Sequence, residues 1–154
     1  MNKLARTMAR DLGAAVGTTV RVCGLVEDLS DDDGHRWARL RDVTGEVPLF
    51  RGRSGSADPI AGILAAVGLG SAVEAVGQVM AGGEAGPDAG FHLDVTELDV
   101  VGPAMGALPV DGSSTLSDRL DWRFVDLRRP RNRLIFEVQT TAEEAMRAYW
   151  HEHG

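Results

Sequence analysis

The sequence has little of what would mark a secreted, membrane-bound or redox-active protein. It contains a single cysteine, Cys23, which cannot form an internal disulfide and is expected to be a buried structural thiol. No apolar run approaches the roughly 18 residues that a membrane span needs. The N-terminal segment also lacks the continuous apolar region of a signal peptide. We therefore expect a cytoplasmic protein that does not enter a membrane.

Positive charge is also scarce over the chain as a whole. Against 23 Asp and Glu residues there are 16 Lys and Arg residues, which gives a formal net charge of −7 and a pI near 5.0. Non-specific affinity for nucleic acid depends on many Lys and Arg contacts to phosphate, so the chain is not a general polyanion binder. Any binding of nucleic acid must be confined to a local surface.

Signatures of catalysis are missing as well. The glycine-rich segment from Gly82 to Gly90 lacks the Lys-Ser/Thr ending of a phosphate-binding loop. His151 and His153 have no further ligand cluster near them, so we expect them to belong to a solvated chain end. No Ser/His/Asp or Cys/His arrangement suggests a nucleophile. The sequence thus predicts no catalytic residue, no metal site, no cofactor and no small-molecule substrate.

What the sequence does contain is a series of short strand patterns. In the first of them, VRVCGLVE, apolar residues such as Val20 and Val22 alternate with Arg21 and Cys23, as in a strand with one buried face. An acidic loop is expected at 28–34. The five predicted strands are Val20–Glu27, His35–Asp42, Glu46–Phe50, Ser71–Met80 and Phe91–Val101.

Two short helices complete this pattern. Asp58 and Pro59 are typical of a helix start and predict a helix over Pro59–Val67, and Leu4–Leu12 also has helical spacing. Five strands with a helix between the third and fourth are the order of an OB-fold. We expect a mainly β protein with a five-stranded Greek-key barrel and a long C-terminal helix. The predicted divisions are 1–102 for the barrel, 103–118 for a linker and 119–154 for the remainder.

The strongest local feature is an arginine-rich segment that leads into the C-terminal helix. Six arginines and two aspartates fall between residues 119 and 133. Pro130 fits the first turn of a helix, and beyond it apolar residues recur at three- and four-residue steps, which gives one apolar stripe. Because a barrel with its own helix already buries its core, this stripe predicts docking against another chain or domain.

Taken in order, these residues resemble a known family. The segments GHRWARLRDVTGEVPLF and RLDWRFVDLRRPRNRLIF are similar to the N-terminal part of aspartyl-tRNA synthetase, most closely its archaeal and eukaryotic type. The most specific element is DLRRP at 126–130. The resemblance implies an OB domain that binds the tRNA anticodon, followed by the helix that begins motif 1 of the class II core. Since the chain stops at Gly154, before motifs 2 and 3, we do not expect it to aminoacylate tRNA alone.

The resemblance assigns nucleic-acid binding to the outer face of the second strand. Trp37 occupies the position of a family aromatic on which an anticodon base stacks, and such stacking needs no sequence code. Arg39 and Arg41 would lie on the same face, and Arg21 on the first strand completes the predicted set. Two alternatives stay open: Trp37 as an ordinary barrel aromatic, and Arg41 in a structural ion pair with Asp42 or a neighbour.

For the C-terminal helix the resemblance implies an interface with a second copy of the chain or with a class II core. The arginines that precede it have two open roles, ion pairing within the protein and contact with tRNA, and the alternation of Arg with Asp favours ion pairing. The predicted interface residues are Arg128, Arg129, Ile135, Val138, Ala142, Met146 and Tyr149.

Two departures from the family bear on binding. Pro48 stands where the family has a Gln that hydrogen-bonds the central anticodon base, and proline offers neither a side-chain donor nor a backbone N–H. The segment at 28–34 is acidic where the family is often basic, so it would repel a phosphate backbone. Three hypotheses follow: a tRNA-binding module, a protein-interaction subunit that pairs through its C-terminal helix, and a generic single-strand binder, which the negative charge disfavours.

Overall fold

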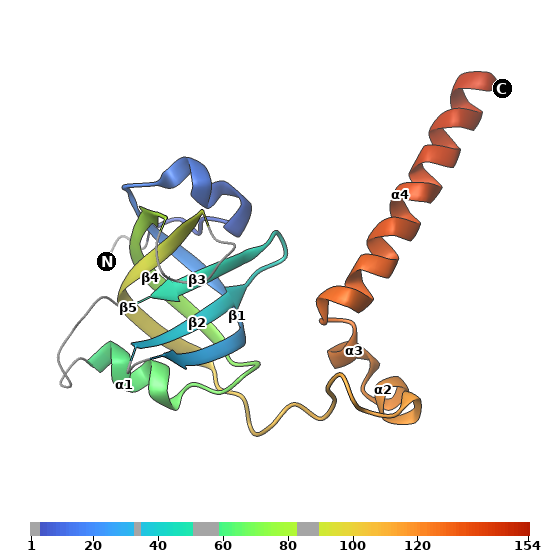
Figure 1. Cartoon of the computed structure of the whole chain (residues 1–154). Helices are drawn as coiled ribbons and strands as arrows, with labels where there is room; N and C mark the ends of the chain where they lie inside the picture. Colours follow the sequence, from blue (N-terminus) through green and yellow to red (C-terminus); the bar gives the residue numbers. More distant parts are fainter. Residues whose placement is uncertain (1–3, 33–34, 51–58, 83–89) are drawn as a thin grey trace. The chain divides into compact units, whose positions relative to one another are not determined.

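The computed structural model describes residues 4–32, 35–50, 59–82 and 90–154 (Figure 1). The chain divides into two compact units, Met1–Ala107 and Leu108–Gly154. Every strand of the described residues belongs to the first unit, whereas the second contains helices and turns. The interior of the glycine-rich segment at 82–90 lies outside the described residues.

Five strands of the first unit close into a barrel in the order β1-β2-β3-β5-β4. Neighbouring strands are antiparallel, except that β3 and β5 run parallel. A short helix, α1 (Pro59–Ala66), lies between β3 and β4 in the chain. This topology confirms the predicted OB-fold barrel. The strands are β1 (Thr19–Asp32), β2 (His35–Arg41), β3 (Glu46–Phe50), β4 (Ala72–Ala81) and β5 (Phe91–Gly102).

Alternation of side chains along the strands separates a buried core from an outer face. Leu40 on β2, Leu49 on β3 and Leu93 on β5 are completely buried. Leu12 and Leu64, from the helices at either end of the barrel, join the same apolar cluster (Figure 1). Because successive residues of a strand point to opposite faces, the neighbours of these leucines are turned toward the outside of the barrel.

Two glycines allow close approach of the strands where the barrel curves. A Cβ atom at Gly24 would collide with the carbonyl group of Arg41, and one at Gly77 with the carbonyl group of Asp94. Gly77 also lies at an irregularity in the pairing of β4 with β5. Since the obstacle in both cases is backbone, no side chain can move aside to make room, and these positions require glycine.

The N-terminal helix lies later in the chain than the helix predicted over Leu4–Leu12. It is a 3-10 helix, η1 (Ala9–Ala15). The carboxylate of Asp42 accepts a hydrogen bond of 2.9 Å from the backbone N–H of Ala9, which fixes the first turn of the helix at that residue. The spacing of apolar residues could not reveal this start, because the carboxylate comes from a distant turn of the chain.

The acidic segment at 28–34, predicted as a loop, is strand over most of its length. β1 continues to Asp32, and its register pairs Asp28 with Arg39 and Asp31 with Arg36. Pairing with the backbone of β2 offsets the low strand propensity of Asp and Ser in this segment. The prediction was wrong because local propensity carries no information about the partner strand.

Three helices form the second unit: α2 (Leu116–Asp121), α3 (Arg123–Asp126) and α4 (Pro130–His153). Thr115 caps α2 by accepting a hydrogen bond from the backbone N–H of Asp118. Arg129 is extended and Pro130 occupies the first turn of α4, which confirms the predicted long C-terminal helix. Within the described part of the chain, no helix is long and apolar enough to cross a membrane.

Candidate nucleic-acid interface

The outer face of β2 carries three of the four residues predicted to bind nucleic acid. Trp37, Arg39 and Arg41 occupy alternate positions, and Ala38 and Leu40 between them are fully buried. Residues two apart on a strand are separated by about 7 Å along it. The three side chains therefore form one row on the outside of the barrel.

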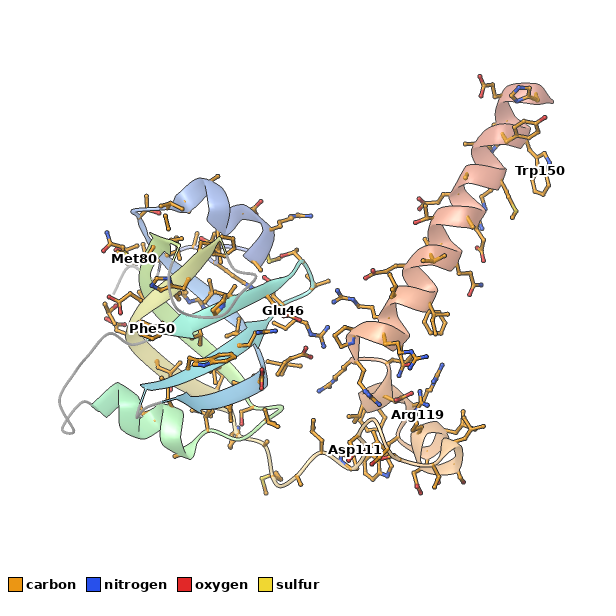
Figure 2. All side chains as sticks on the ribbon, in the orientation of Figure 1. Glu46, Phe50, Met80, Asp111, Arg119 and Trp150 are labelled. Carbon is orange, nitrogen blue, oxygen red and sulfur yellow. The ribbon has the colours of Figure 1, made fainter. Side chains whose placement is uncertain are left out.

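Arg39 lies between an aromatic ring and a carboxylate. Its guanidinium carbon is 5.6 Å from the centre of the Trp37 ring, within the range of a cation–π contact. Its Nη1 atom is 3.5 Å from Oε2 of Glu46, which lies on β3 (Figure 2). Both side chains of this ion pair are 37% exposed. Ion pairs so open to solvent are worth only about 0–1 kcal/mol.

Arg41 is held more tightly than Arg39. Its Nη2 atom forms an ion pair with Oε1 of Glu27, and its side chain is only 10% exposed. Glu27 follows the buried Val26 and therefore lies on the outer face, where the ladder between β1 and β2 is irregular and leaves it beside Arg41. Of the alternatives left open by the sequence, the geometry favours a structural ion pair with a neighbour.

Arg21 lies apart from the row on β2. It pairs in register with Val76 of β4, whereas β1 pairs with β2 only from Leu25 onward. Its Nη2 atom is 2.6 Å from Oε2 of Glu74, and this hydrogen bond raises the pKa of the Arg21 guanidinium. The structure therefore does not bring Arg21 together with Trp37.

Two aromatic side chains on adjoining strands were missed by the sequence analysis. Phe50 of β3 and His92 of β5 meet edge to face, with ring centres 5.6 Å apart. The register pairs Ala38 of β2 with Leu49 of β3, so the next residues in register are Trp37 and Phe50. The sequence could have indicated both aromatic residues, because each is adjacent in its strand to a buried leucine, Leu49 or Leu93, and must therefore point to the outer face.

Pro48 separates Phe50 from Glu46 along β3. It pairs in register with Arg39 and is buried. Because proline has neither a side-chain donor nor a backbone N–H, this position offers a ligand no hydrogen-bond donor.

Asp42 organises the turn after β2. Its Oδ1 atom accepts hydrogen bonds from the backbone N–H groups of Thr44 and Gly45, at 2.6 and 3.0 Å, while Oδ2 accepts from Ala9. Burial pushes the pKa of this carboxyl up, but the hydrogen bonds from Thr44, Ala9 and Gly45 outweigh it and hold the pKa below its usual value. Asp42 is thus explained by turn formation.

In the second unit, three arginines converge on one buried carboxylate. Asp126 has no exposed side-chain surface, and its two oxygens accept hydrogen bonds of 3.0 and 3.2 Å from Arg119. Arg123 and Arg129 place Nη1 atoms 3.1 and 3.9 Å from the same carboxylate. The hydrogen bond from Arg119 holds the pKa of Asp126 below its usual value, although burial opposes it. The amide of Asn132 donates to the Asp126 carbonyl, so this cluster also ties α4 to α3.

The two arginines predicted for the interface of the helical arm differ in environment. Arg129 donates a hydrogen bond of 2.7 Å to the carbonyl of Asp111, which is labelled in Figure 2. Arg128 is exposed. Arg129 is therefore engaged in holding its own unit together.

The apolar stripe of α4 is uncovered within its own unit. Asn132 is the one residue of the helix that is buried. Two aromatic residues that were not part of the predicted stripe, Phe136 and Trp150, are also exposed and widen the apolar surface. Trp150 is labelled in Figure 2. The five predicted stripe residues are all exposed: Ile135, Val138, Ala142, Met146 and Tyr149.

Other chemical features of the described residues are sparse. No group of three His, Cys, Asp or Glu side chains among them could hold a metal ion. A cavity of about 470 Å³ beside α1 is lined by small apolar residues and by Ser71, whose hydroxyl accepts a hydrogen bond from the backbone N–H of Ala104. Cys23 is half-buried rather than buried as expected, and burial raises the pKa of its thiol, which weakens it as a nucleophile.

Sequence comparison identifies relatives over almost the whole chain. The chain is 34% identical over 148 residues to aspartate–tRNA(Asp/Asn) ligase of Haloferax volcanii, a match that covers 92% of this chain and 33% of the ligase. It is 32% identical over 156 residues to aspartate–tRNA(Asp/Asn) ligase of Deinococcus radiodurans, which covers 98% of this chain and 33% of that protein. No protein-family model matches. The chain spans about a third of the length of the curated relatives it matches, and the predicted resemblance to the N-terminal region of aspartyl-tRNA synthetases is confirmed.

Solved structures give the same fold. Asparaginyl-tRNA synthetase from Pyrococcus horikoshii, solved with asparaginyl-adenylate, matches with a TM-score of 0.82 at 22% identity, over 100% of this chain and 35% of that chain. An OBody, AM3L09, solved bound to hen egg-white lysozyme, matches with a TM-score of 0.58 at 20% identity, over 68% of this chain and 100% of that one. At these identities the likeness establishes the fold alone.

We expect the second unit to lose stability in acid through Asp126. Because the pKa of this carboxyl is lowered in the folded protein, its charge stabilises the fold above the ordinary Asp pKa of about 4, and the stabilisation disappears as the pH falls through the lowered value. We follow the thermal melting of the helices by circular dichroism. At pH 7 the melting temperature of Asp126→Asn should be lower than that of the wild type, and this difference should shrink below about pH 4.

The exposed Asp121 of the same segment provides the control for this experiment, since Asp121→Asn removes a carboxylate without touching the buried cluster. Its melting temperature should follow that of the wild type. A difference between Asp126→Asn and the wild type that is constant from neutral to acid pH would contradict the assigned role.

Proposed function

We propose that this chain, which is similar over nearly its full length to a third of aspartate–tRNA ligases, is a tRNA-binding module that meets the anticodon on the outer face of β2. In this proposal residues 1–102 bind RNA in the cytoplasm, 103–118 form a linker and 119–154 form a docking arm. The activity of the relatives as whole enzymes is a property of proteins about three times as long.

The observation that carries the proposal is the placement of Trp37. Its ring is half-buried and turned outward on β2, next to a guanidinium that remains partly exposed. Aromatic rings on the open face of OB strands stack with unpaired bases, and a neighbouring arginine can contact phosphate. Phe50 and His92 extend the aromatic surface across the next two strands.

Binding on this face would depend on stacking more than on charge. Arg41 and Arg21 are already engaged with Glu27 and Glu74. Pro48 supplies no hydrogen-bond donor to a base. Since salt dependence reports the number of phosphates that a protein neutralises, we expect modest affinity with a shallow dependence on salt.

Titration with tRNA bearing the aspartate anticodon, at two salt concentrations, tests the proposal. Trp37→Ala should weaken binding about 5- to 150-fold, because stacking contributes about 1–3 kcal/mol per base. Trp150→Ala is the matched control: it removes the same ring from α4 in the other unit and should leave the affinity unchanged. Absence of binding at low salt, or equal affinity of Trp37→Ala and wild type, would contradict anticodon binding by this face.

A second function, pairing through α4, is favoured by the exposed apolar stripe. The residues of the stripe are separated by three, four or seven positions, which is the spacing of a helix that packs along its length. They include Ile135, Val138, Ala142 and Tyr149. Nothing within the unit 108–154 covers these side chains. The resemblance implies two occupants for this surface, a second copy of the chain and a class II synthetase-like core.

Light scattering of the isolated chain measures self-pairing directly. We expect a mass above the 16.4 kDa of one chain, and Val138→Asp should return it to that value because a carboxylate cannot be buried in an apolar seam without large cost. Thr140→Asp places the same charge away from the stripe and should leave the mass unchanged. A wild-type chain that stays a monomer while its helix is stable would count against pairing with itself.

A further inference from the structure

We propose that Glu46 sets the RNA affinity of the β2 face by holding Arg39 over the ring of Trp37. This inference rests on the proposed function and names a regulator of that same site. Arg39 is the guanidinium that must change partner when RNA binds, and Glu46 is the group that resists the change.

The geometry of three side chains carries the inference. In the ladder of β2 with β3, Glu46 lies directly opposite Arg41 and diagonal to Arg39. Long side chains reach across such a diagonal, and here Nη1 of Arg39 comes within 3.5 Å of the Glu46 carboxylate. The same guanidinium lies 5.6 Å from the centre of the Trp37 ring. One face of the ring on which a base would stack is therefore occupied by Arg39.

Burial separates this arginine from the others on the barrel. The side chains of Arg41 and Arg21 are 10% and 21% exposed and are fixed against Glu27 and Glu74. Arg39 and its partner are both more exposed, so water screens their attraction and the pair is weak. A phosphate group binds arginine through two parallel charge-assisted hydrogen bonds and can compete with such a pair.

A ligand that displaces Arg39 must therefore offer two things at once. It needs a phosphate to replace Glu46 as the partner of the guanidinium, and it needs an unpaired base to cover the Trp37 ring that Arg39 leaves. The Glu46 carboxylate remains within the screening length of about 10 Å and repels ligands that bring charge alone. This arrangement selects flexible single-stranded RNA, whose bases are free to stack, over duplexes and simple polyanions.

The variant Glu46→Gln, compared with wild type in a titration with the tRNA and with a single-stranded RNA of the anticodon-loop sequence, tests the inference. The amide is isosteric but cannot hold Arg39 by charge, so we expect binding about two- to fivefold tighter at low salt. In the wild-type complex the freed Glu46 carboxylate offsets the charge that Arg39 brings to the phosphate, so removing this carboxylate should also steepen the slope of log affinity against log salt by up to about 0.7. Combining Glu46→Gln with Arg39→Ala should abolish both gains.

Glu74→Gln is the matched control, since it removes a carboxylate from Arg21 outside the β2 row and should change neither affinity nor slope. If wild type binds and Glu46→Gln has the same affinity and slope, the inference is overturned while the proposed function stands. If only Glu46→Gln binds, the inference holds and RNA binding by the wild type is rejected. If neither binds, both are rejected.

Discussion

The two-residue period of strand β2 determines what the barrel can present to a ligand. Burial of Ala38 and Leu40 in a closed core leaves Trp37, Arg39 and Arg41 no position other than the outer face. The same alternation turns Phe50 of β3 and His92 of β5 outward beside them. The candidate site is thus a consequence of core packing, and it keeps its geometry as long as the barrel stays closed.

Charge pairing then decides how that surface behaves. In a chain with more acidic than basic residues, Arg21, Arg39 and Arg41 of the outer barrel meet glutamates on neighbouring strands. In the second unit, three arginines gather around Asp126. The more buried of these ion pairs stabilise the fold, because removing one partner would leave the other as an uncompensated buried charge. Arg39 alone among the predicted set combines substantial exposure with a weak partner, which makes it the residue through which affinity is adjusted.

Much of the fold could be predicted because its signals are local. Alternation in the strands and Pro130 at the start of α4 identify elements from a few neighbouring residues, and their order identifies the OB-fold. What could not be predicted depends on pairing between distant segments: the extension of β1 through Asp32, the start of η1 at the Asp42 carboxylate, and the glutamate partner of each arginine. The sequence therefore predicted which residues belong to the candidate site. It could not predict which glutamate pairs with each arginine, because that depends on the register of the strands.

The measurement that tests the central claim most directly is a nuclear magnetic resonance titration of the isotope-labelled chain with an anticodon stem-loop RNA. The chain has three tryptophans, one on the barrel and two in the second unit, so each indole N–H reports on its own surface. The account predicts that the Trp37 signal and the backbone signals of β2 and β3 shift, while Trp122 and Trp150 do not. Shifts confined to residues 108–154 would contradict it.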